Sequence, residues 1–261
     1  MGDDIVRVRN SSYAKYEELL MRRDEIKKQA FLYERAYVRE FGDLILDVFR
    51  MKMEAIRKKK TIGYCQAFAN RGEAVDQKAL QEYLAKELAE YQEKLDGMIR
   101  DHEAAKKNGQ ISEADLLRIR RIYHRLVKKI HPDIYPLTDE NEELSELWQR
   151  LIAAYNCNNL REMEETEFLV NALLEKLESG LSAVSIPDID EKIAELEAEI
   201  EKIKSTDPYQ YRYLLEDETA VSEKKGELRE ELKAYEDYGR QLDEVLSGLL
   251  QKGVTLTWRM N

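Results

Sequence analysis

Apolar side chains recur at a helical spacing through the first part of the chain. From about Ser12 to Lys60 they step by three or four positions almost throughout, with Arg23 filling the one gap, which is typical of one side of a long helix. The stripe consists of Tyr16, Leu19, Ile26, Ala30, Tyr33, Tyr37, Phe41, Leu44, Val48, Met51 and Ala55. Ser11 or Ser12 can cap the start of this helix, and the basic run 57–60 suits its end, where the dipole favours cations. That run could instead contact a phosphate or an acidic partner.

A second long helix is predicted over 76–107. The stretch 61–76 contains Gly63 and Gly72 and interrupts the period, and the pair Asn108-Gly109 is a typical helix stop. The stripe of this helix consists of Leu80, Leu84, Leu88, Tyr91, Leu95, Met98 and His102. Two long amphipathic helices with a short connection bury their stripes most easily against each other, so we expect an antiparallel hairpin in an elongated molecule.

The last third of the chain predicts another helical hairpin. A helix over 188–204 follows from the 4-3-4-3 spacing of a coiled-coil seam, formed by Ile189, Ile193, Leu196, Ile200 and Ile203. The segment 205–208 ends in a proline and stops this helix. A helix over 215–251 then continues the pattern with Val221, Leu228, Leu232, Tyr235, Leu242, Leu246 and Leu249. The alternative for so regular a seam is that it mediates dimerisation.

The two ends of the chain depart from this helical pattern. Residues 5–9 and 254–258 are rich in β-branched side chains and partly alternate, so they predict short strands that could pair with each other. The expected fold class is all-α, with long antiparallel, coiled-coil-like hairpins on either side of a central helical module. The corresponding domains are 1–109, 110–180 and 181–261.

The central module has an unusual charge distribution. From Ser112 to His131 it has six basic residues against two acidic ones, a local charge of +4 in a chain whose net charge is −11. A helix over 112–130 has the apolar stripe Leu116, Ile119, Tyr123, Leu126 and Ile130 and the basic residues Arg118, Arg120, Arg121, Arg125, Lys128 and Lys129. Pro132 cannot continue it.

Two further helices are predicted in this module, over 141–156 and 159–178. The first of them has Leu144, Trp148, Leu151 and Tyr155 on one stripe. We expect it to pack antiparallel to the helix over 112–130. The core between the two would contain Ile119, Tyr123, Leu126, Trp148, Leu151 and Tyr155.

Two segments of this module resemble the J-domain, the module of DnaJ-type co-chaperones. The sequence Tyr123-His124-Arg125-Leu126, followed by Lys128-Lys129-Ile130-His131-Pro132-Asp133, is similar to helix II and the His-Pro-Asp (HPD) loop of that family. The stretch 147–155, in which an aromatic residue precedes an Ala-Tyr pair, is similar to its helix III. In the family these helices pack antiparallel and present HPD at their tip. The basic face of helix II docks on a DnaK-type chaperone, and HPD triggers ATP hydrolysis by that chaperone.

The resemblance covers residues 111–160, about a fifth of the chain, and implies roles for particular residues. His131, Pro132 and Asp133 would be the trigger. The docking cations would be Arg118, Arg121, Arg125, Lys128 and Lys129. The chain departs from the family in having no recognisable helix I, no Gly/Phe-rich linker and no cysteine-rich zinc module. It also has Ile134 where a basic residue is common.

Each residue of the tripeptide also has an ordinary structural explanation. His131 could cap the carbonyls of the preceding helix, Pro132 could stop that helix, and Asp133 could begin an Asx turn. None of these three roles requires the neighbouring cations.

Composition and motifs argue against several other classes of protein. The net charge of −11 disfavours broad nucleic-acid binding, and two cysteines, Cys65 and Cys157, make neither a disulfide framework nor a four-thiolate zinc site. The three histidines lack the spacing of a metal site, and no Gly-rich phosphate loop or nucleophile elbow occurs, so we expect neither an enzyme nor a cofactor. No apolar run approaches about 18 residues and no leader opens the chain, which indicates a soluble, cytoplasmic protein without membrane contact.

Two function classes remain. In the first, the protein is a co-chaperone whose J-like tip recruits a DnaK-type chaperone, while the hairpins bind a client or position the tip. In the second, it is a structural or scaffolding protein that keeps the J-like hairpin without its activity and could form homo-oligomers through its helical stripes. An exposed HPD tip beside an open basic face would favour the first class. Long helices that cover that face would favour the second.

Overall fold

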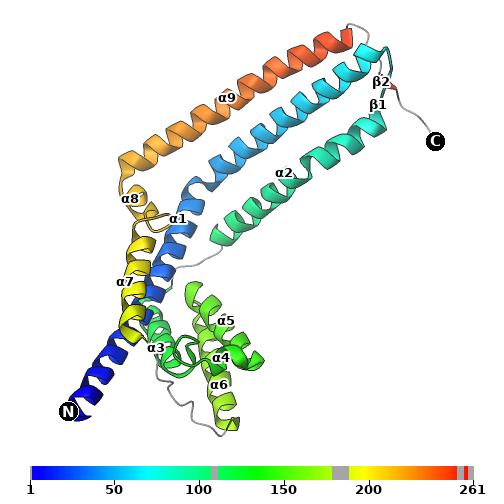
Figure 1. The fold of residues 1–261 in the computed structure, drawn as a ribbon. Helices are drawn as coiled ribbons and strands as arrows, with labels where there is room; N and C mark the ends of the chain where they lie inside the picture. Colours follow the sequence, from blue (N-terminus) through cyan, green and yellow to red (C-terminus); the bar gives the residue numbers. More distant parts are fainter. Residues whose placement is uncertain (1, 107–110, 178–187, 252–255, 258–261) are drawn as a thin grey trace. The chain divides into compact units, whose positions relative to one another are not determined.

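The computed structural model describes residues 2–106, 111–177, 188–251 and 256–257 of the chain. Helices make up nearly all of these residues, which confirms the predicted all-α fold (Figure 1). The helices are α1 (Gly2–Arg71), α2 (Gln77–Lys106), α3 (Glu113–Ile130), α4 (Leu137–Glu140), α5 (Glu142–Asn156), α6 (Leu160–Lys176), α7 (Ile189–Lys204), α8 (Tyr211–Glu216) and α9 (Glu218–Gln251). Two-residue strands, β1 (Val75–Asp76) and β2 (Leu256–Thr257), pair in parallel.

The chain divides into two compact units, and α1 contributes to both. The first unit consists of Met1–Glu34 and Gly109–Arg212, and the second of Arg35–Asn108 and Tyr213–Asn261. The three consecutive domains expected from the sequence differ from this division. A continuous helix contains no linker, so no shift of composition marks the point where α1 passes from one unit to the next.

Helix α1 is longer than its predicted span at both ends. Residues 5–9 are helical, so the predicted N-terminal strand is wrong, and Ser11 and Ser12 lie inside the helix instead of capping it. A strand needs a neighbour to satisfy its backbone hydrogen bonds, whereas a helix satisfies them within the segment, and the β preference of the side chains is too weak to outweigh this.

The C-terminal end of α1 also lies beyond the predicted stop. Gly63 is part of the helix, which runs to Arg71 and ends before Gly72, whose φ of +71° is the left-handed conformation typical of a residue just after a helix. The basic run 57–60 therefore does not sit at a helix end. Its members form ion pairs instead, Arg57 with Glu54, Lys58 with Asp243 and Lys60 with Glu87.

The predicted C-terminal strand is confirmed for residues 256–257, and its other members lie outside the described residues. Its partner is β1, with Val75 opposite Leu256, and not the N-terminal segment.

In the first unit, α3, α5 and α6 form a three-helix module with its own core. Tyr123 stacks on Tyr155 with 3.8 Å between ring centroids, and His131 lies 4.8 Å from Trp148, so α3 and α5 run antiparallel as predicted. All six predicted core residues are buried, namely Ile119, Tyr123, Leu126, Trp148, Leu151 and Tyr155. Leu116 is the exception on the predicted stripe, because its side chain is 37% exposed. Met163 and Val170 of α6 complete the core.

The coiled-coil stripe of α7 packs on the first part of α1. Its residues Ile193, Leu196 and Ile200 are buried together with Tyr16, Leu19, Leu20, Ile26 and Ala30 of α1, and Ile134 belongs to the same cluster. Ion pairs between Lys15 and Glu197 and between Lys27 and Glu199 border this contact. The predicted hairpin of the helices over 188–204 and 215–251 is therefore wrong, because α1 covers the stripe of the first one within the chain.

In the second unit, the later part of α1 lies between α2 and α9 (Figure 1). Helix α2 runs antiparallel to it, as predicted, and α9 runs parallel to it, so that Leu228 meets Phe41 and Val48, and Leu242 meets Ala55. Each apolar stripe predicted a buried helix face correctly, but a stripe carries no information on which other stripe will cover it.

Helix α2 makes a tight contact with α1 at Gly42. The side chain of His102 is buried, and a Cβ atom added to Gly42 would lie 2.4 Å from its Cδ2 atom. That distance is below any normal contact, so the packing of the two helices needs a residue without a side chain at this position.

Gly42→Ala should therefore lower the free energy of unfolding by about 1–3 kcal/mol, the usual cost of overpacking a well-packed contact. Gly63→Ala is the matched control, because it lies in the same helix with nothing within 4 Å of an added Cβ. It should raise stability by up to about 1 kcal/mol through helix propensity alone. Urea unfolding of both variants measures the difference, and equal effects would contradict the assignment.

Trp148→Ala should destabilise the three-helix module by about 3–5 kcal/mol, because the indole ring is 8% exposed and fills the contact between α3 and α5. Phe168→Ala is the control from the same module, since Phe168 is 72% exposed and its loss should change stability by less than about 0.5 kcal/mol. A Trp148→Ala variant that unfolds at the wild-type denaturant concentration would contradict the assignment of this core.

Candidate functional site

The HPD tripeptide lies directly after α3 and forms a tight turn. His131 ends the helix with its backbone N–H bonded to the Val127 carbonyl at 3.1 Å, and Pro132 prevents another helical turn. The carbonyl of His131 accepts hydrogen bonds from the N–H groups of Ile134 and Tyr135 at 2.9 and 2.8 Å. The backbone of His131, and not its side chain, thus takes the capping role considered for it.

The imidazole ring of His131 is buried between α5 and α1. It is 2% exposed and lies edge-on to Trp148. The Nδ1 atom accepts a hydrogen bond from the Asp133 N–H at 3.1 Å, so the ring proton resides on Nε2. Nε2 lies 3.6 Å from a carboxylate oxygen of Asp24 on α1 and 3.3 Å from a guanidinium nitrogen of Arg23. Because Arg23 can only donate, the proton on Nε2 faces Asp24.

Asp24 is the centre of this contact between α1 and the three-helix module. Its side chain is 8% exposed in the folded chain, and it accepts a 2.7 Å hydrogen bond from the Tyr123 hydroxyl and a 2.9 Å bond from Arg23. Burial alone would raise the pKa of Asp24, but the contact with His131, the charge of Arg23 and the hydrogen bond from Tyr123 hold it below its usual value. The cost of burying this carboxylate is thus offset by its contacts with Tyr123, Arg23 and His131. Arg23 also reaches Asp133 at 3.2 Å.

Neighbouring charged residues of α1 close over Tyr155. The Tyr155 hydroxyl donates a 2.5 Å hydrogen bond to Glu25, and the Lys28 ammonium lies 3.8 Å from the centre of its ring. Lys28 is itself buried, which lowers its pKa to about 8. Sequence reasoning missed Asp24, Glu25 and Lys28 as parts of this site. The available signal was Arg23, a cation at a position where the α1 stripe calls for an apolar residue.

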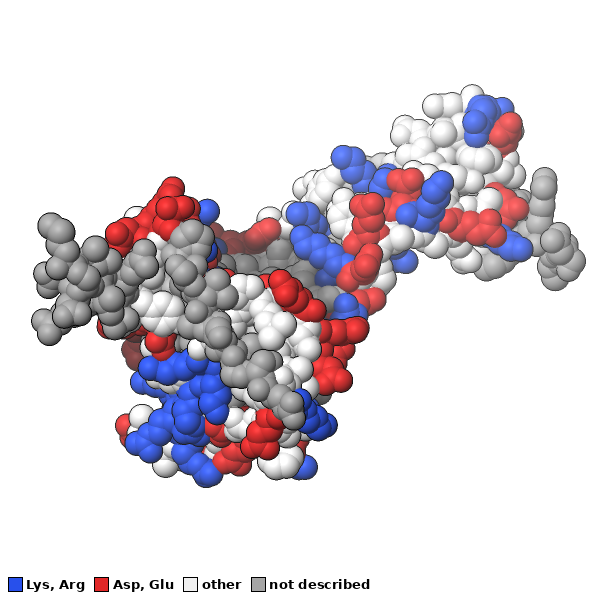
Figure 2. All heavy atoms as spheres, turned by 60° about the horizontal axis from the view of Figure 1, so that its bottom comes forward, with Lys and Arg blue, Asp and Glu red and all other residues white. Residues whose placement is uncertain are grey.

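The predicted docking cations of α3 are mostly paired within the chain. Their partners on α1 and α6 are Glu17 for Lys128, Glu164 for Arg118, Glu167 for Arg125 and Asn171 for Lys129. Arg120, a cation of α3 outside the predicted set, pairs with Glu25 of α1. The Arg125 contact is bidentate, at 2.7 and 2.9 Å. In Figure 2, acidic side chains lie next to basic ones over much of the face shown, and basic side chains also gather in one group at the lower left. Arg121 forms no ion pair with any residue that the structure describes.

The tripeptide is therefore not an exposed tip beside an open cationic face. His131 is enclosed, Pro132 is half-buried and Asp133 is exposed, and α1 lies over the side of α3 that carries Arg120 and Lys128. In this conformation the arrangement favours the scaffolding class over a co-chaperone whose docking surface is open.

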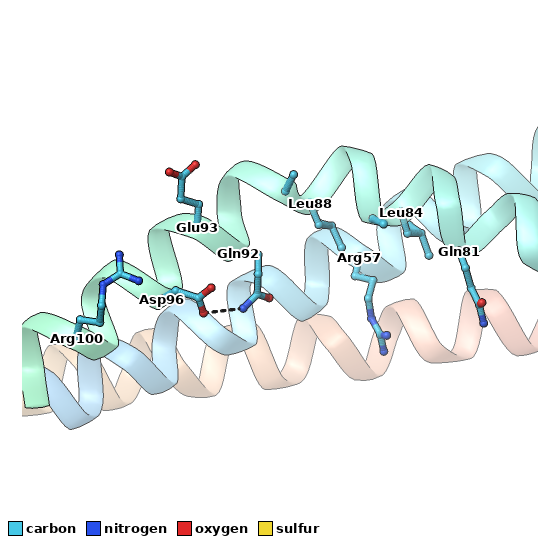
Figure 3. A pocket seen from close by; sticks show the side chains of 10 residues that line it. Arg57, Gln81, Leu84, Leu88, Gln92, Glu93, Asp96 and Arg100 are labelled. Carbon is cyan, nitrogen blue, oxygen red and sulfur yellow. Dashed lines mark hydrogen bonds between the residues drawn. The ribbon is translucent and has the colours of Figure 1, made fainter.

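Two clefts were considered as ligand sites. One of about 330 Å³ follows the seam between α1 and the tripeptide and is lined by charges of both signs, among them Arg23, Asp24 and Asp133. Another of about 750 Å³ lies along α2 in the second unit, where Leu84 and Leu88 form an apolar floor with charged residues around it (Figure 3). Nothing in either lining selects a particular ligand.

Metal binding, nucleophilic catalysis and membrane insertion each require particular groups. Within the described ranges, no cluster of three or more His, Cys, Asp or Glu side chains could hold a metal ion. Both cysteines are free, and burial raises the pKa of the Cys65 thiol, which disfavours a nucleophilic role. None of the described helices combines the length and the apolar character needed to cross a bilayer.

Comparison of the chain with family models, with curated proteins and with solved structures gives no match in any of the three. The similarity to the J-domain therefore rests on the residues around HPD.

Asp24→Asn should lower the free energy of unfolding at pH 7 by about 1–3 kcal/mol, because an amide cannot replace a carboxylate among three donors. The folded-state pKa of Asp24 lies below its ordinary value of 3.8, so its contribution is complete above that pH and is lost as the pH falls through the folded value. The difference between wild type and variant should thus shrink below about pH 4.

Urea unfolding at a series of pH values measures this difference. Glu18→Gln is the control, since Glu18 is exposed on the same helix, and its effect should stay near zero at every pH. A wild-type advantage over Asp24→Asn that persists unchanged to about pH 2 would contradict a stabilising ionised Asp24.

Proposed function

We propose that the protein is a J-domain-type co-chaperone that recruits a DnaK-type chaperone and stimulates its ATPase. The observation that carries the proposal is the position of the tripeptide, directly after a basic helix that packs antiparallel to a second helix around an aromatic core. This is the arrangement that the resemblance implies for HPD. His131 and Asp133 act as the trigger, and the cations of α3 are the docking surface.

Two further features support a partner of this kind. Arg121 is exposed, and Asp133 is exposed although it forms an ion pair with Arg23, so both can reach another protein. The charge of +4 on residues 112–131 attracts an acidic partner and increases its rate of encounter. In this proposal the helices of the second unit bind a client protein. The two free cysteines fit the cytoplasm, where disulfides are rare.

A scaffolding function is the second candidate, and the burial of His131 favours it. In that role the histidine, 2% exposed and facing Asp24, clamps α1 to the three-helix module. Pro132 and Asp133 then only shape the turn. This class needs no nucleotide-binding partner.

Asp133→Asn should abolish stimulation of a DnaK-type ATPase in single-turnover measurements, with the unfolding transition nearly unchanged because the side chain is exposed. His131→Gln should have the same effect on stimulation. Asp139→Asn is the matched control, since Asp139 is an exposed acid in the same connection between α3 and α5. Equal stimulation by wild type and Asp133→Asn would contradict the proposal.

Stimulation by wild type should fall as salt is raised, because the Debye length shrinks from about 10 Å at 0.1 M to about 3 Å at 1 M.

A further inference from the structure

Acidic residues of α1 match basic residues of α3 where the two helices meet. Glu17 meets Lys128 at 3.0 Å, and Glu25 meets Arg120 at 2.8 Å. Complementary charge of this kind is what guides one protein onto another. Helix α1 therefore occupies the place on this surface that an acidic partner would take.

The same stretch of α1 also encloses the trigger. Asp24 faces the Nε2 atom of His131, and Arg23 forms an ion pair with Asp133 at 3.2 Å. With its ring 2% exposed, His131 cannot contact a second protein while α1 stays in place. A single segment, residues 17–28 of α1, thus both pairs with Arg120 and Lys128 and encloses His131.

The contact between this segment and the module is mainly polar, and each side keeps its own core. Among the α1 side chains that the structure describes, the half-buried Met21 is the one that packs on the hydrophobic core of the three-helix module. The apolar side of α1 packs on α7 and on Ile134 instead. Lys128 and Arg120 have side chains that are 58% and 52% exposed, while their partners Glu17 and Glu25 are 17% and 24% exposed. Ion pairs with a solvent-exposed member contribute about 0–1 kcal/mol each. The hydrogen bonds that Tyr123 and Tyr155 donate to Asp24 and Glu25 add to the contact. Separation of α1 from α3 would leave the core of the module intact.

We propose that residues 17–28 of α1 are a built-in competitor for the docking surface, so that a DnaK-type chaperone binds only the fraction of molecules in which this segment has left α3. This regulation rests on the proposed function, because a competitor needs a ligand to compete with. The apparent affinity for the chaperone is reduced by the fraction of molecules in the open state. Weakening the α1 contacts raises that fraction and hence the apparent affinity.

The double variant Glu17→Gln, Glu25→Gln removes the two acidic partners that α1 supplies to the α3 cations and leaves Glu164 and Glu167 of α6 in place. Its matched control is Glu18→Gln, Glu34→Gln, which makes the same change in net charge at two exposed positions of α1 outside the contact. Both are used as full-length chains in the single-turnover ATPase assay. The contact variant should reach half-maximal stimulation at a concentration at least about fivefold lower than wild type, as expected for the loss of two modest ion pairs. The control pair should behave as wild type.

The outcomes separate the regulation from the function. If wild type and both double variants stimulate with equal concentration dependence, α1 is not a competitor, while the co-chaperone function stands. If none of the three stimulates, the proposed function fails, and the regulation fails with it. A gain in the contact variant that Asp133→Asn removes supports both.

A second measurement does not depend on ATP hydrolysis. Carbodiimide coupling joins a lysine and a carboxylate that are in contact. Wild type in the absence of the chaperone should therefore give a Glu17–Lys128 cross-link. Addition of a saturating concentration of the DnaK-type chaperone should lower the yield of this cross-link severalfold. An unchanged yield within the isolated complex would overturn the competitor role.

Discussion

The burial of Asp24 against the end of α3 is the interaction on which the first unit depends. A carboxylate that is 8% exposed is tolerated only where donors surround it, and here Tyr123, Arg23 and His131 are those donors. Two of these three belong to α3 and the turn that follows it, so satisfying Asp24 sets the position of α1 along the module. Once that position is set, the charged residues one or two turns away meet partners on the same surface.

The second constraint is the continuity of α1. Its apolar stripe is longer than one partner helix can cover, so α7 packs on the first part and α9 on the later part, each running parallel to α1. Each of the two units contains one segment of this helix, which contributes to its core. The glycine at position 42 belongs to the same arrangement, because α2 approaches α1 there with a buried histidine.

These two constraints bear on how HPD could work. In a scaffolding protein the tripeptide would hold α1 against the three-helix module. In a co-chaperone it would be a trigger that α1 covers or exposes. Both use the same bonds of His131, and the difference lies in the free energy needed to separate α1 from α3. That free energy contains the hydrogen bond from Tyr123 to Asp24, the exposed ion pairs of α3 with α1, and the apolar contacts of Ile134 and Met21 across the boundary.

The sequence alone determined the helical fold and the buried faces, because the period of apolar residues follows from local geometry. It also determined the core around Tyr123 and Trp148, whose two helices are close in sequence and joined by the connection 131–141, which contains α4. The extended N-terminal strand was a wrong prediction, since side-chain preference could not reveal that a neighbouring strand is lacking there. Only the tertiary structure decided that α1 covers the stripe of α7 and the tripeptide. Apolar stripes are interchangeable in sequence, and charges such as Asp24 and His131, more than a hundred residues apart, reveal their pairing only when the chain brings them together.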